Sequence, residues 1–301
     1  MDRPDLRLLL VHAHPDDEVI MSGLTMARYA DEGVGVTLVT CTLGEEGEVL
    51  VPDLANLAAS DEDRLGQHRI EELAEAMRII GVEDHRFLGG PGRYRDSGMV
   101  FDDRGYATAL ETVRDDSFWR ADLLEAAAHL VAIIREVQPQ VVVTYDEFGN
   151  YGHPDHIQAH RVATYATALA AVRPYRPDLG PAWQVAKVYW TANSESELRE
   201  LIRARRAAGD TTTFEGVDPD GEMPFRAASD DDLTARIHAP ELAARKTKAM
   251  RAHASQIAAD GEFFAGGDDV WTTEWFVLAA GTPGCPAPGS PWEDDLFAGV
   301  R

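Results

Sequence analysis

The chain has 301 residues and a formal net charge of −24, so it can bury a substantial core beneath a strongly acidic surface. Clustered Lys and Arg bind nucleic acids and anionic membranes, and we therefore expect neither partner for this chain. No apolar stretch approaches the length of a bilayer span, and the first residues show no secretory pattern. The two cysteines, Cys41 and Cys285, form no disulfide framework, and we expect a cytoplasmic protein.

Short apolar runs alternate with amphipathic stretches along roughly the first two thirds of the chain. The first run, residues 7–12, is continuous and β-branched near its end, which is typical of a buried parallel strand. Further strands are predicted at residues 34–41, 85–88, 140–145 and 185–191, and helices at 18–32, 61–80, 119–137, 157–172 and 195–207. This alternation predicts βαβ units and a mostly parallel sheet.

The alternation weakens after Gly209. Residues 210–232 are polar and predict a loop with short strands, whereas residues 240–257 predict a helix. The apolar, aromatic stretch 271–279 fits either a strand or a helix. We therefore predict an α/β protein, with a doubly wound, mostly parallel sheet over residues 1–190. A smaller α+β portion, residues 191–301, is expected to pack over the functional site.

Two clusters of histidine and aspartate follow two of the predicted strands. Residues 14–18 (His-Pro-Asp-Asp-Glu) follow the first strand, and residues 153–156 (His-Pro-Asp-His) follow the fourth. In the doubly wound strand order 3-2-1-4, the first and fourth strands are neighbours, and a crevice opens beyond their carboxyl ends. One such cluster alone is equally well explained as a turn with a helix cap. Two clusters at matched strand ends favour a single shared metal site.

The residue types in the clusters suit a catalytic metal. Pro15 ends the strand, so that His14 and Asp17 can face one side, and His156 is the expected third ligand. A catalytic zinc keeps three such ligands and an open position for water, although ferrous iron accepts the same set. Asp16 would then point towards the bound water, where a carboxylate is a natural general base.

The second cluster also offers groups for proton transfer. His153 is expected beside the site, with Asp155 close by to hold its ring. A histidine held by a carboxylate can stay protonated near neutral pH and act as an acid or as a donor to an oxyanion. Tyr151 can place its hydroxyl on the same oxyanion. Glu18 is interpreted as a charge at the start of a helix rather than as a ligand.

Other classes of protein require sequence motifs that this chain lacks or leaves open. A nucleotide-binding module needs Gly-x-Gly-x-x-Gly in the first strand–helix turn, where this chain has carboxylates that would repel a pyrophosphate. A serine hydrolase of the α/β class needs Gly-x-Ser-x-Gly, which does not occur in the sequence. A non-catalytic binding protein remains an alternative that the sequence leaves open.

Together the two clusters resemble the motifs of the LmbE-like (PIG-L) deacetylase family. The supporting segments are residues 40–49, 68–73, 92–99, 143–146 and 149–153. The resemblance covers most of residues 6–190 and continues more weakly through residues 246–256. It implies a Rossmann-like catalytic domain over residues 1–190, with one zinc per chain. The implied ligands are His14, Asp17 and His156, and the implied catalytic residues are Asp16, His153, Asp155 and Tyr151.

Within this family, the chain is most similar to the deacetylases of mycothiol biosynthesis. That similarity implies a small sugar–inositol substrate that carries an N-acetyl group. It also places Arg69, Asp96 and Glu48 at positions used around the sugar and inositol hydroxyls. Arginine is a rigid hydrogen-bond donor and carboxylates accept from hydroxyls, so these residue types suit that role. For Arg69, an exposed helix cation is the alternative that the residues alone favour.

A paralogous group, the mycothiol S-conjugate amidases, is the main alternative. Its pattern has a lysine where this chain has Ser22, and glycine, arginine and aspartate where it has Leu43, Glu46 and Glu48. The segment Met21-Ser22 also differs from the Ser-Asn of the deacetylase pattern. The sequence therefore favours the deacetylase while leaving activity on larger conjugates open, and it does not predict an oligomeric state.

Overall fold

The computed structural model describes residues 3–210, 217–221, 223, 226–259, 261–264, 267–286 and 289–300. Within these residues, seven strands form one sheet in the order β3-β2-β1-β6-β7-β9-β8. The first five run parallel, and β9 pairs antiparallel with both β7 and β8. In sheet order the bounds are β3 (Asp84–Phe87), β2 (Gly35–Thr40), β1 (Arg7–His12), β6 (Val141–Thr144), β7 (Lys187–Ala192), β9 (Thr273–Ala280) and β8 (Ala235–His238). A separate hairpin joins β4 (Val100–Phe101) to β5 (Ala107–Thr108).

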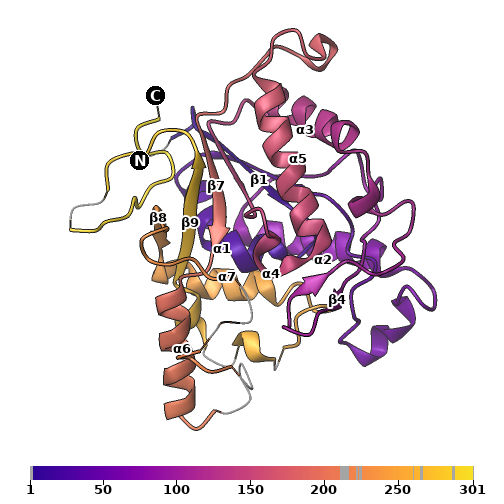
Figure 1. Ribbon diagram of the computed structural model, residues 1–301, viewed down its shortest axis with the longest axis vertical. Helices are drawn as coiled ribbons and strands as arrows, with labels where there is room; N and C mark the ends of the chain where they lie inside the picture. Colours follow the sequence, from indigo (N-terminus) through magenta and orange to yellow (C-terminus); the bar gives the residue numbers. More distant parts are fainter. Residues whose placement is uncertain are drawn as a thin grey trace.

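Helices cover both faces of the sheet (Figure 1). They are α1 (Asp17–Asp31), α2 (Leu65–Ile80), α3 (Leu123–Val137), α4 (Gly149–Gly152), α5 (Pro154–Ala170), α6 (Glu195–Ala207) and α7 (Ala243–Met250). Short 3-10 turns occupy Pro52–Leu57, Phe118–Arg120, Pro177–Leu179, Pro240–Leu242, Glu262–Phe264 and Asp268–Trp271. Along β1, Leu8 and Leu10 face a core shared with α1, α2 and α7, whereas Leu9 and Val11 face the core under α3 and α5. This alternation is the two-residue period of a strand buried on both sides.

The predicted parallel sheet is confirmed, and so is the pairing of the first and fourth predicted strands, on which the site depends. Strand β6, the fourth strand predicted from the sequence, pairs directly with β1, with Leu8 opposite Val141 and Leu10 opposite Val143. The stretch 271–279, which fitted either element, is the strand β9. The carboxyl ends of β1 and β6 therefore lie side by side, and each leads into one of the two His/Asp clusters.

The C-terminal third differs in part from its prediction. The helix predicted over residues 240–257 is an α-helix only over Ala243–Met250, because the chain then turns and sends His253 and Ser255 into the interior. Within the predicted loop 210–232, residues 211–216, 222, 224 and 225 lie outside the described residues. The predicted boundary at residue 190 falls inside β7, and β8 and β9 belong to the same sheet. The division into two portions stays a prediction.

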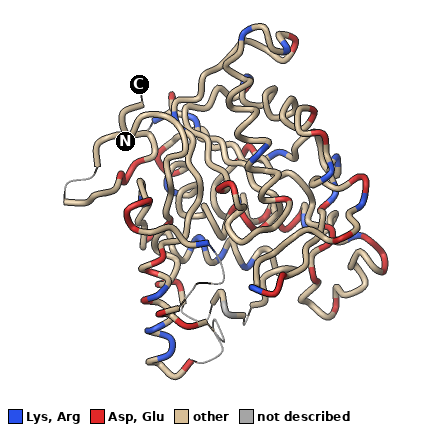
Figure 2. The backbone as a smooth tube through the Cα atoms, in the orientation of Figure 1, with Lys and Arg blue, Asp and Glu red and all other residues tan. Residues whose placement is uncertain are grey.

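Charged groups are spread over the helices and loops of the molecule, with Lys and Arg interspersed among the more numerous Asp and Glu (Figure 2). This distribution suits a solvated acidic surface. None of the described helices combines the length and the apolar character that crossing a membrane requires.

Helix α1, which follows the first cluster, is held by a buried ion pair from the C-terminal third. The Lys246 ammonium donates to Glu274 Oε1 at 2.8 Å and to the carbonyl of Ile20 at 2.8 Å. Glu274 in turn accepts from the backbone N–H groups of Leu24 and Thr25, at 2.8 and 2.9 Å. The charged pair therefore fixes the position of α1 against α7 and β9.

Removing the buried cation should destabilise the fold. In Lys246→Met, the Glu274 carboxylate stays buried without its charged partner, and we expect the free energy of unfolding to fall by about 3–5 kcal/mol. Urea denaturation followed by circular dichroism measures this change. Lys248→Met, an exposed lysine on the same helix, is the matched control and should change little. Equal stability of the two variants would contradict the role given to the pair.

Candidate metal and catalytic site

The first cluster forms a strained turn between β1 and α1. Asp16 has φ 106° and ψ −35°, a positive φ that is rare outside glycine and costs of order 1–3 kcal/mol. Its backbone N–H donates to Glu18 Oε2 at 2.9 Å, and its carboxylate accepts from the Arg69 guanidinium at 3.0 Å. Asp17 lies in the first turn of α1, where a negative charge is favourable. The turn therefore presents the two aspartates in different directions.

The second cluster is the start of α5. His153 caps this helix, because its Nδ1 accepts the backbone N–H of Asp155 at 3.1 Å, and Pro154 occupies the first helical position. A neutral His153 in this arrangement carries its proton on Nε2. The Tyr151 ring lies edge-on to His156, with 5.0 Å between ring centroids, and 6.1 Å from the ring of His153.

The structure brings the three predicted ligands together. Asp17 Oδ2 lies 3.3 Å from His14 Nδ1 and 3.3 Å from His156 Nε2. Two ligand atoms bound tetrahedrally at about 2.0–2.1 Å from zinc lie roughly 3.3 Å apart, so these spacings suit that ion. All three side chains are buried.

Unpaired nitrogen atoms support a cation in this cluster. Both ring nitrogens of His156 are buried without a hydrogen-bond partner among the described residues. A buried polar atom left unpaired is costly, and a bound cation would pair with such an imidazole nitrogen. Ligand atoms of His14, His153 and His156 all lie within 4.8 Å of one another, as do those of His14, Asp96 and Asp155. These residues fit a metal ion such as Zn²⁺. His14 belongs to both groups and His156 to the first, whereas Asp17 belongs to neither, so the predicted ligand set stays a prediction.

The contact of Asp155 with His14 Nε2, the ring nitrogen that does not face Asp17, indicates the role of Asp155. His14 Nε2 lies 3.3 Å from Asp155 Oδ2 and 3.5 Å from Asp96 Oδ1. We predicted the Asp155 carboxylate against the ring of His153, and the contacts correct this. Ser97 attracts the carboxylate instead, because its backbone N–H donates at 2.9 Å and its hydroxyl donates to the second oxygen. A carboxylate on the far nitrogen of a metal-binding histidine fixes its tautomer and orientation.

The three residues predicted to contact substrate take different positions. Arg69 is 3 % exposed, and it donates to the Asp16 carboxylate and to the carbonyls of Pro15 and Gly44 rather than lying free on its helix. Asp96 is buried beside His14 and accepts from backbone N–H groups of the loops around it.

Glu48 is exposed, and its carbonyl accepts from the side chain of Gln256 at 3.1 Å. The structure therefore brings Arg69 and Asp96 into the cluster and leaves Glu48 at the surface.

Burial dominates the electrostatics of the site. It raises the pKa of Asp16 to about 6, although Arg69 opposes the shift. Burial would also raise the pKa of Asp17, but His156 and His14 hold it well below its usual range. For His153, burial and the neighbouring imidazoles of His14 and His156 lower the pKa well below the ordinary value. The carboxylate expected to keep His153 protonated is turned to His14 instead, so a protonated His153 stays a prediction.

Tyr145 is a site residue to which the sequence assigned no role. Its hydroxyl donates to Asp17 Oδ2 at 2.8 Å and accepts the backbone N–H of Ala13 at 2.8 Å. Its ring also stacks on His156, with centroids 4.2 Å apart. The available signal was its place at the end of the fourth predicted strand, which leads towards the second cluster. Tyr145 therefore orients two of the three predicted ligands.

Removing this hydroxyl should weaken metal binding. Tyr145→Phe keeps the ring on His156 but leaves the Ala13 N–H without its acceptor and Asp17 Oδ2 with only the backbone N–H of His14 as a hydrogen-bond donor. We expect metal affinity to fall about 10–100-fold, as for other outer contacts of metal ligands. Competition with a chromophoric chelator measures it. Tyr165→Phe, an exposed tyrosine on α5, is the control, and an unchanged affinity in Tyr145→Phe would contradict the orienting role.

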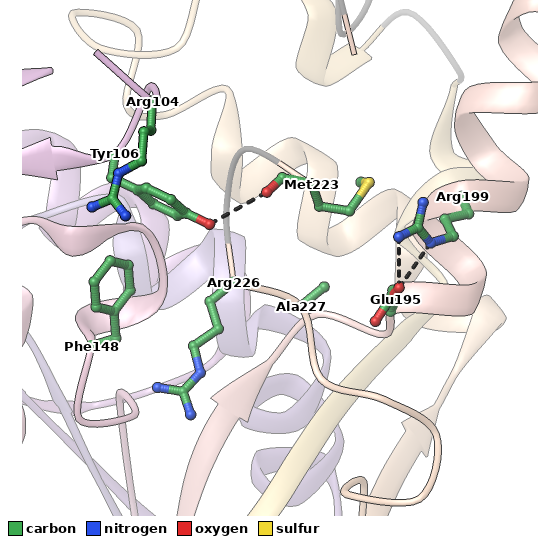
Figure 3. Close-up of a pocket in the computed structure, with 8 residues that line it drawn as sticks. All are labelled: Arg104, Tyr106, Phe148, Glu195, Arg199, Met223, Arg226 and Ala227. Carbon is green, nitrogen blue, oxygen red and sulfur yellow. Dashed lines mark hydrogen bonds and ion pairs between the residues drawn. The ribbon is translucent and has the colours of Figure 1, made fainter. Parts of the chain in front are cut away.

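A separate cavity of about 480 Å³ lies between the β4–β5 hairpin and α6 (Figure 3). Tyr106 and Phe148 line one side, and Glu195, Arg199 and Met223 line the other. The Tyr106 hydroxyl donates to the Met223 carbonyl at 3.3 Å, and Arg199 pairs with Glu195. None of its lining residues is a predicted ligand or catalytic residue, so this cavity is not the metal site.

A buried His/Asp cluster at the carboxyl ends of two central parallel strands is typical of an α/β enzyme that binds a metal ion. The family model described as GlcNAc-PI de-N-acetylase (PIG-L) matches residues 9–167, more than half of the chain. The chain therefore belongs to the PIG-L family, and the predicted resemblance is confirmed. The family model and the curated relatives are named deacetylases, as are several of the structural relatives, and the chain is a hydrolase of this class.

Curated relatives match over their full length. The chain is 61 % identical to a protein of Kribbella flavida over 99 % of each chain, and 60 % identical to one of a Nocardioides species over 98 % of this chain and 99 % of the relative. A protein of Streptomyces avermitilis is 52 % identical over 99 % of each chain. All three are named 1D-myo-inositol 2-acetamido-2-deoxy-alpha-D-glucopyranoside deacetylase.

Solved structures share the fold at low identity. The N,N′-diacetylchitobiose deacetylase of Pyrococcus horikoshii matches with a TM-score of 0.59 and 20 % identity, over 92 % of this chain and 84 % of that one. A 4-carboxy-2-hydroxymuconate hydratase of Pseudomonas putida matches with a TM-score of 0.57 and 16 % identity, over 92 % and 97 %. Since a hydratase has the same architecture, the fold by itself does not determine the reaction.

Proposed function

We propose that this enzyme hydrolyses the N-acetyl group of 1-D-myo-inositol 2-acetamido-2-deoxy-α-D-glucopyranoside, a step of mycothiol biosynthesis. Full-length relatives at 52–61 % identity carry that name, and this is the observation that supports the substrate. The buried His/Asp cluster supports the chemistry, because amide hydrolysis needs an activated water and donors for an oxyanion. We place the reaction in the cytoplasm.

We propose one zinc ion per chain, held by His14, Asp17 and His156. Two imidazoles and one carboxylate are a common ligand set for a catalytic zinc, and ferrous iron is the alternative. A zinc ion held by these residues would supply an activated water and would polarise the acetyl carbonyl. Asp155 and Tyr145 would hold two of the ligands in place, as their contacts with His14 and Asp17 suggest.

Asp16 is the proposed general base. It takes a proton from the attacking water, and the water oxygen forms a bond with the acetyl carbon. A base is most effective when its pKa lies near the working pH, and burial brings the pKa of Asp16 to about 6. When the C–N bond breaks, the leaving nitrogen takes up a proton, which gives acetate and the free amine.

His153 and Tyr151 are the proposed partners of the oxyanion. With Nδ1 accepting the helix N–H, a neutral His153 donates from Nε2, and Tyr151 offers a hydroxyl that burial keeps protonated by raising its pKa. In this arrangement the protonated Asp16 can return its proton to the amine. His153 as the proton donor, the other role expected from the sequence, is the alternative.

The sugar and inositol hydroxyls would meet the surroundings of the cluster. Glu48, exposed and free to accept from hydroxyls, is the proposed contact at the surface. Arg69 and Asp96 are proposed to border the substrate while holding Asp16 and His14. Residues 191–301 are proposed to complete the site through Gln256, whose side chain already donates to the carbonyl of Glu48.

A side-by-side assay tests this function. Release of free amine is followed with the acetylglucosaminyl-inositol and with a mycothiol S-conjugate, and metal content is measured on the same sample. We expect kcat/KM to be at least about tenfold higher for the acetylglucosaminyl-inositol, a preference worth about 1.4 kcal/mol. Higher efficiency on the conjugate would favour the amidase, and no amine from either substrate in a zinc-loaded sample would reject amide hydrolysis of both.

A further inference from the structure

A buried pair of residues outside the predicted ligand set, Glu18 and His253, connects the site to the C-terminal third of the chain. Glu18, interpreted from the sequence as a charge at the start of α1, is fully buried. Its Oε1 lies 2.8 Å from Nε2 of His253, which is also fully buried. The two residues are 235 positions apart, and His253 belongs to the turn that ends α7.

The second oxygen of Glu18 connects this pair to Asp16. Glu18 Oε2 accepts the backbone N–H of Asp16 at 2.9 Å. Asp16 is one of the few described non-glycine residues with a positive φ, and this conformation persists only where the surroundings impose it. One oxygen of Glu18 thus holds the strained peptide, while the other is held by His253.

The contacts of Asp16 show how Glu18 affects the direction in which the Asp16 carboxylate points. Arg69 holds its carboxylate, and Glu18 holds its backbone, so two separate hydrogen bonds define the turn. Without His253, the buried Glu18 carboxylate would lose the imidazole that pairs with its Oε1, and the side chain could adopt another rotamer. The Asp16 N–H would then lose its acceptor, and the turn could relax towards an ordinary φ.

We propose that His253 is a positioning residue for the reaction, acting through Glu18 to hold Asp16 in the strained conformation in which its carboxylate serves as general base. This inference rests on the proposed role of Asp16. Among the described residues, the side chain of His253 pairs with Glu18 and hydrogen-bonds to no predicted metal ligand. Its effect should therefore fall on kcat, with KM and metal content unchanged.

Two substitutions of His253 separate hydrogen bonding from packing. His253→Ala removes the donor to Glu18, and kcat should fall about 10²-fold, the cost of a small misplacement of a reacting group. His253→Gln keeps a donor, and kcat should recover to within about fivefold of the native value, on the same reasoning. Ser255→Ala is the matched control, because Ser255 lies on the same turn but donates to Glu72 of α2.

A second pair of variants decides the question should His253→Ala not fold. Glu18→Gln keeps an acceptor for the Asp16 N–H, whereas Glu18→Leu fills the space without one. We expect kcat of Glu18→Gln to exceed that of Glu18→Leu by about tenfold or more at equal zinc content, since only the first can hold the turn. Equal kcat values in these two variants would overturn the proposal.

The measurements distinguish this proposal from the proposed function. A folded His253→Ala variant with native kcat overturns the positioning role and leaves the deacetylase activity standing. Equal losses in His253→Ala and His253→Gln, or a loss of zinc in either variant, also overturn it. If the native enzyme releases no amine, the proposed function fails first. Native kcat in Asp16→Asn removes the base on which the proposal depends.

Discussion

Asp16→Asn should lower kcat by about 10²–10⁴-fold and leave the metal content of the protein unchanged. The amide keeps the shape of the side chain and can still accept a hydrogen bond from Arg69, whose guanidinium lies 3.0 Å from the native carboxylate. It cannot take a proton from water. Asp16 also lies outside the proposed ligand set, so the protein should still bind one zinc. Amine release under saturating substrate, with metal analysis of the same preparation, measures both quantities.

Glu71→Gln is the control for this substitution. It makes the same change from carboxylate to amide at an exposed position of α2, and its kcat should stay close to the native value. A kcat in Asp16→Asn within a few-fold of the native enzyme would contradict the assignment of the base. Loss of zinc in the same variant would mean that Asp16, and not only Asp17, contributes to the metal site.

His156→Ala should remove both metal and activity. His156 Nε2 lies 3.3 Å from Asp17 Oδ2, and neither ring nitrogen has a hydrogen-bond partner among the described residues. Loss of one of three ligands should cost more than the roughly 10–100-fold that outer contacts cost. We therefore expect zinc affinity to fall by more than about 10²-fold and amine release to fall with it. Isothermal titration of the metal-free protein with zinc measures the affinity.

A histidine elsewhere in the fold is the control for this loss. His129 lies on α3, is partly exposed and pairs with Glu125, so His129→Ala should bind zinc as the native protein does. Full zinc occupancy in His156→Ala at native affinity would count against its role as a ligand. The overlapping group of His14, Asp96 and Asp155 would then be the better description of the metal site.

The sequence predicted the meeting of the two clusters because topology determines it. A short apolar run followed by a helix predicts one βα unit, and the doubly wound order places the first and fourth strands together. The pairing of β1 with β6 confirms that step. His14 follows β1 and His156 lies on α5 after β6, with 5.3 Å between their ring centroids. No information beyond strand order was needed to bring residues about 140 positions apart into one site.

Side-chain direction could not be predicted in the same way. Asp155 follows His153 closely in sequence, which suggested a contact between them, but Ser97 offers two donors from the loop that also carries Asp96. Glu18 was assigned to the start of α1 from its local position, and its actual partner, His253, comes from a turn near the C-terminal end. Contacts between distant loops depend on packing, which neither periodicity nor motif spacing encodes.

The extent of α7 illustrates the same limit. Residues 240–257 have helical spacing, yet the helix ends at Met250, and the chain then uses His253 and Ser255 to reach α1 and α2. Tertiary hydrogen bonds to two buried carboxylates outweigh the local preference for a few more helical residues. The segment that departs from its local pattern is also the one that reaches the turn carrying Asp16.

The central claim is that a single metal ion in the His/Asp cluster enables removal of the acetyl group. A titration of the metal-free enzyme with zinc tests it most directly, with amine release from the acetylglucosaminyl-inositol measured at each addition. We expect the rate to rise in proportion to zinc and to level off at about one equivalent per chain, since the described residues offer one such cluster around His14. Full activity without metal, or no amine at any zinc level, would contradict the claim.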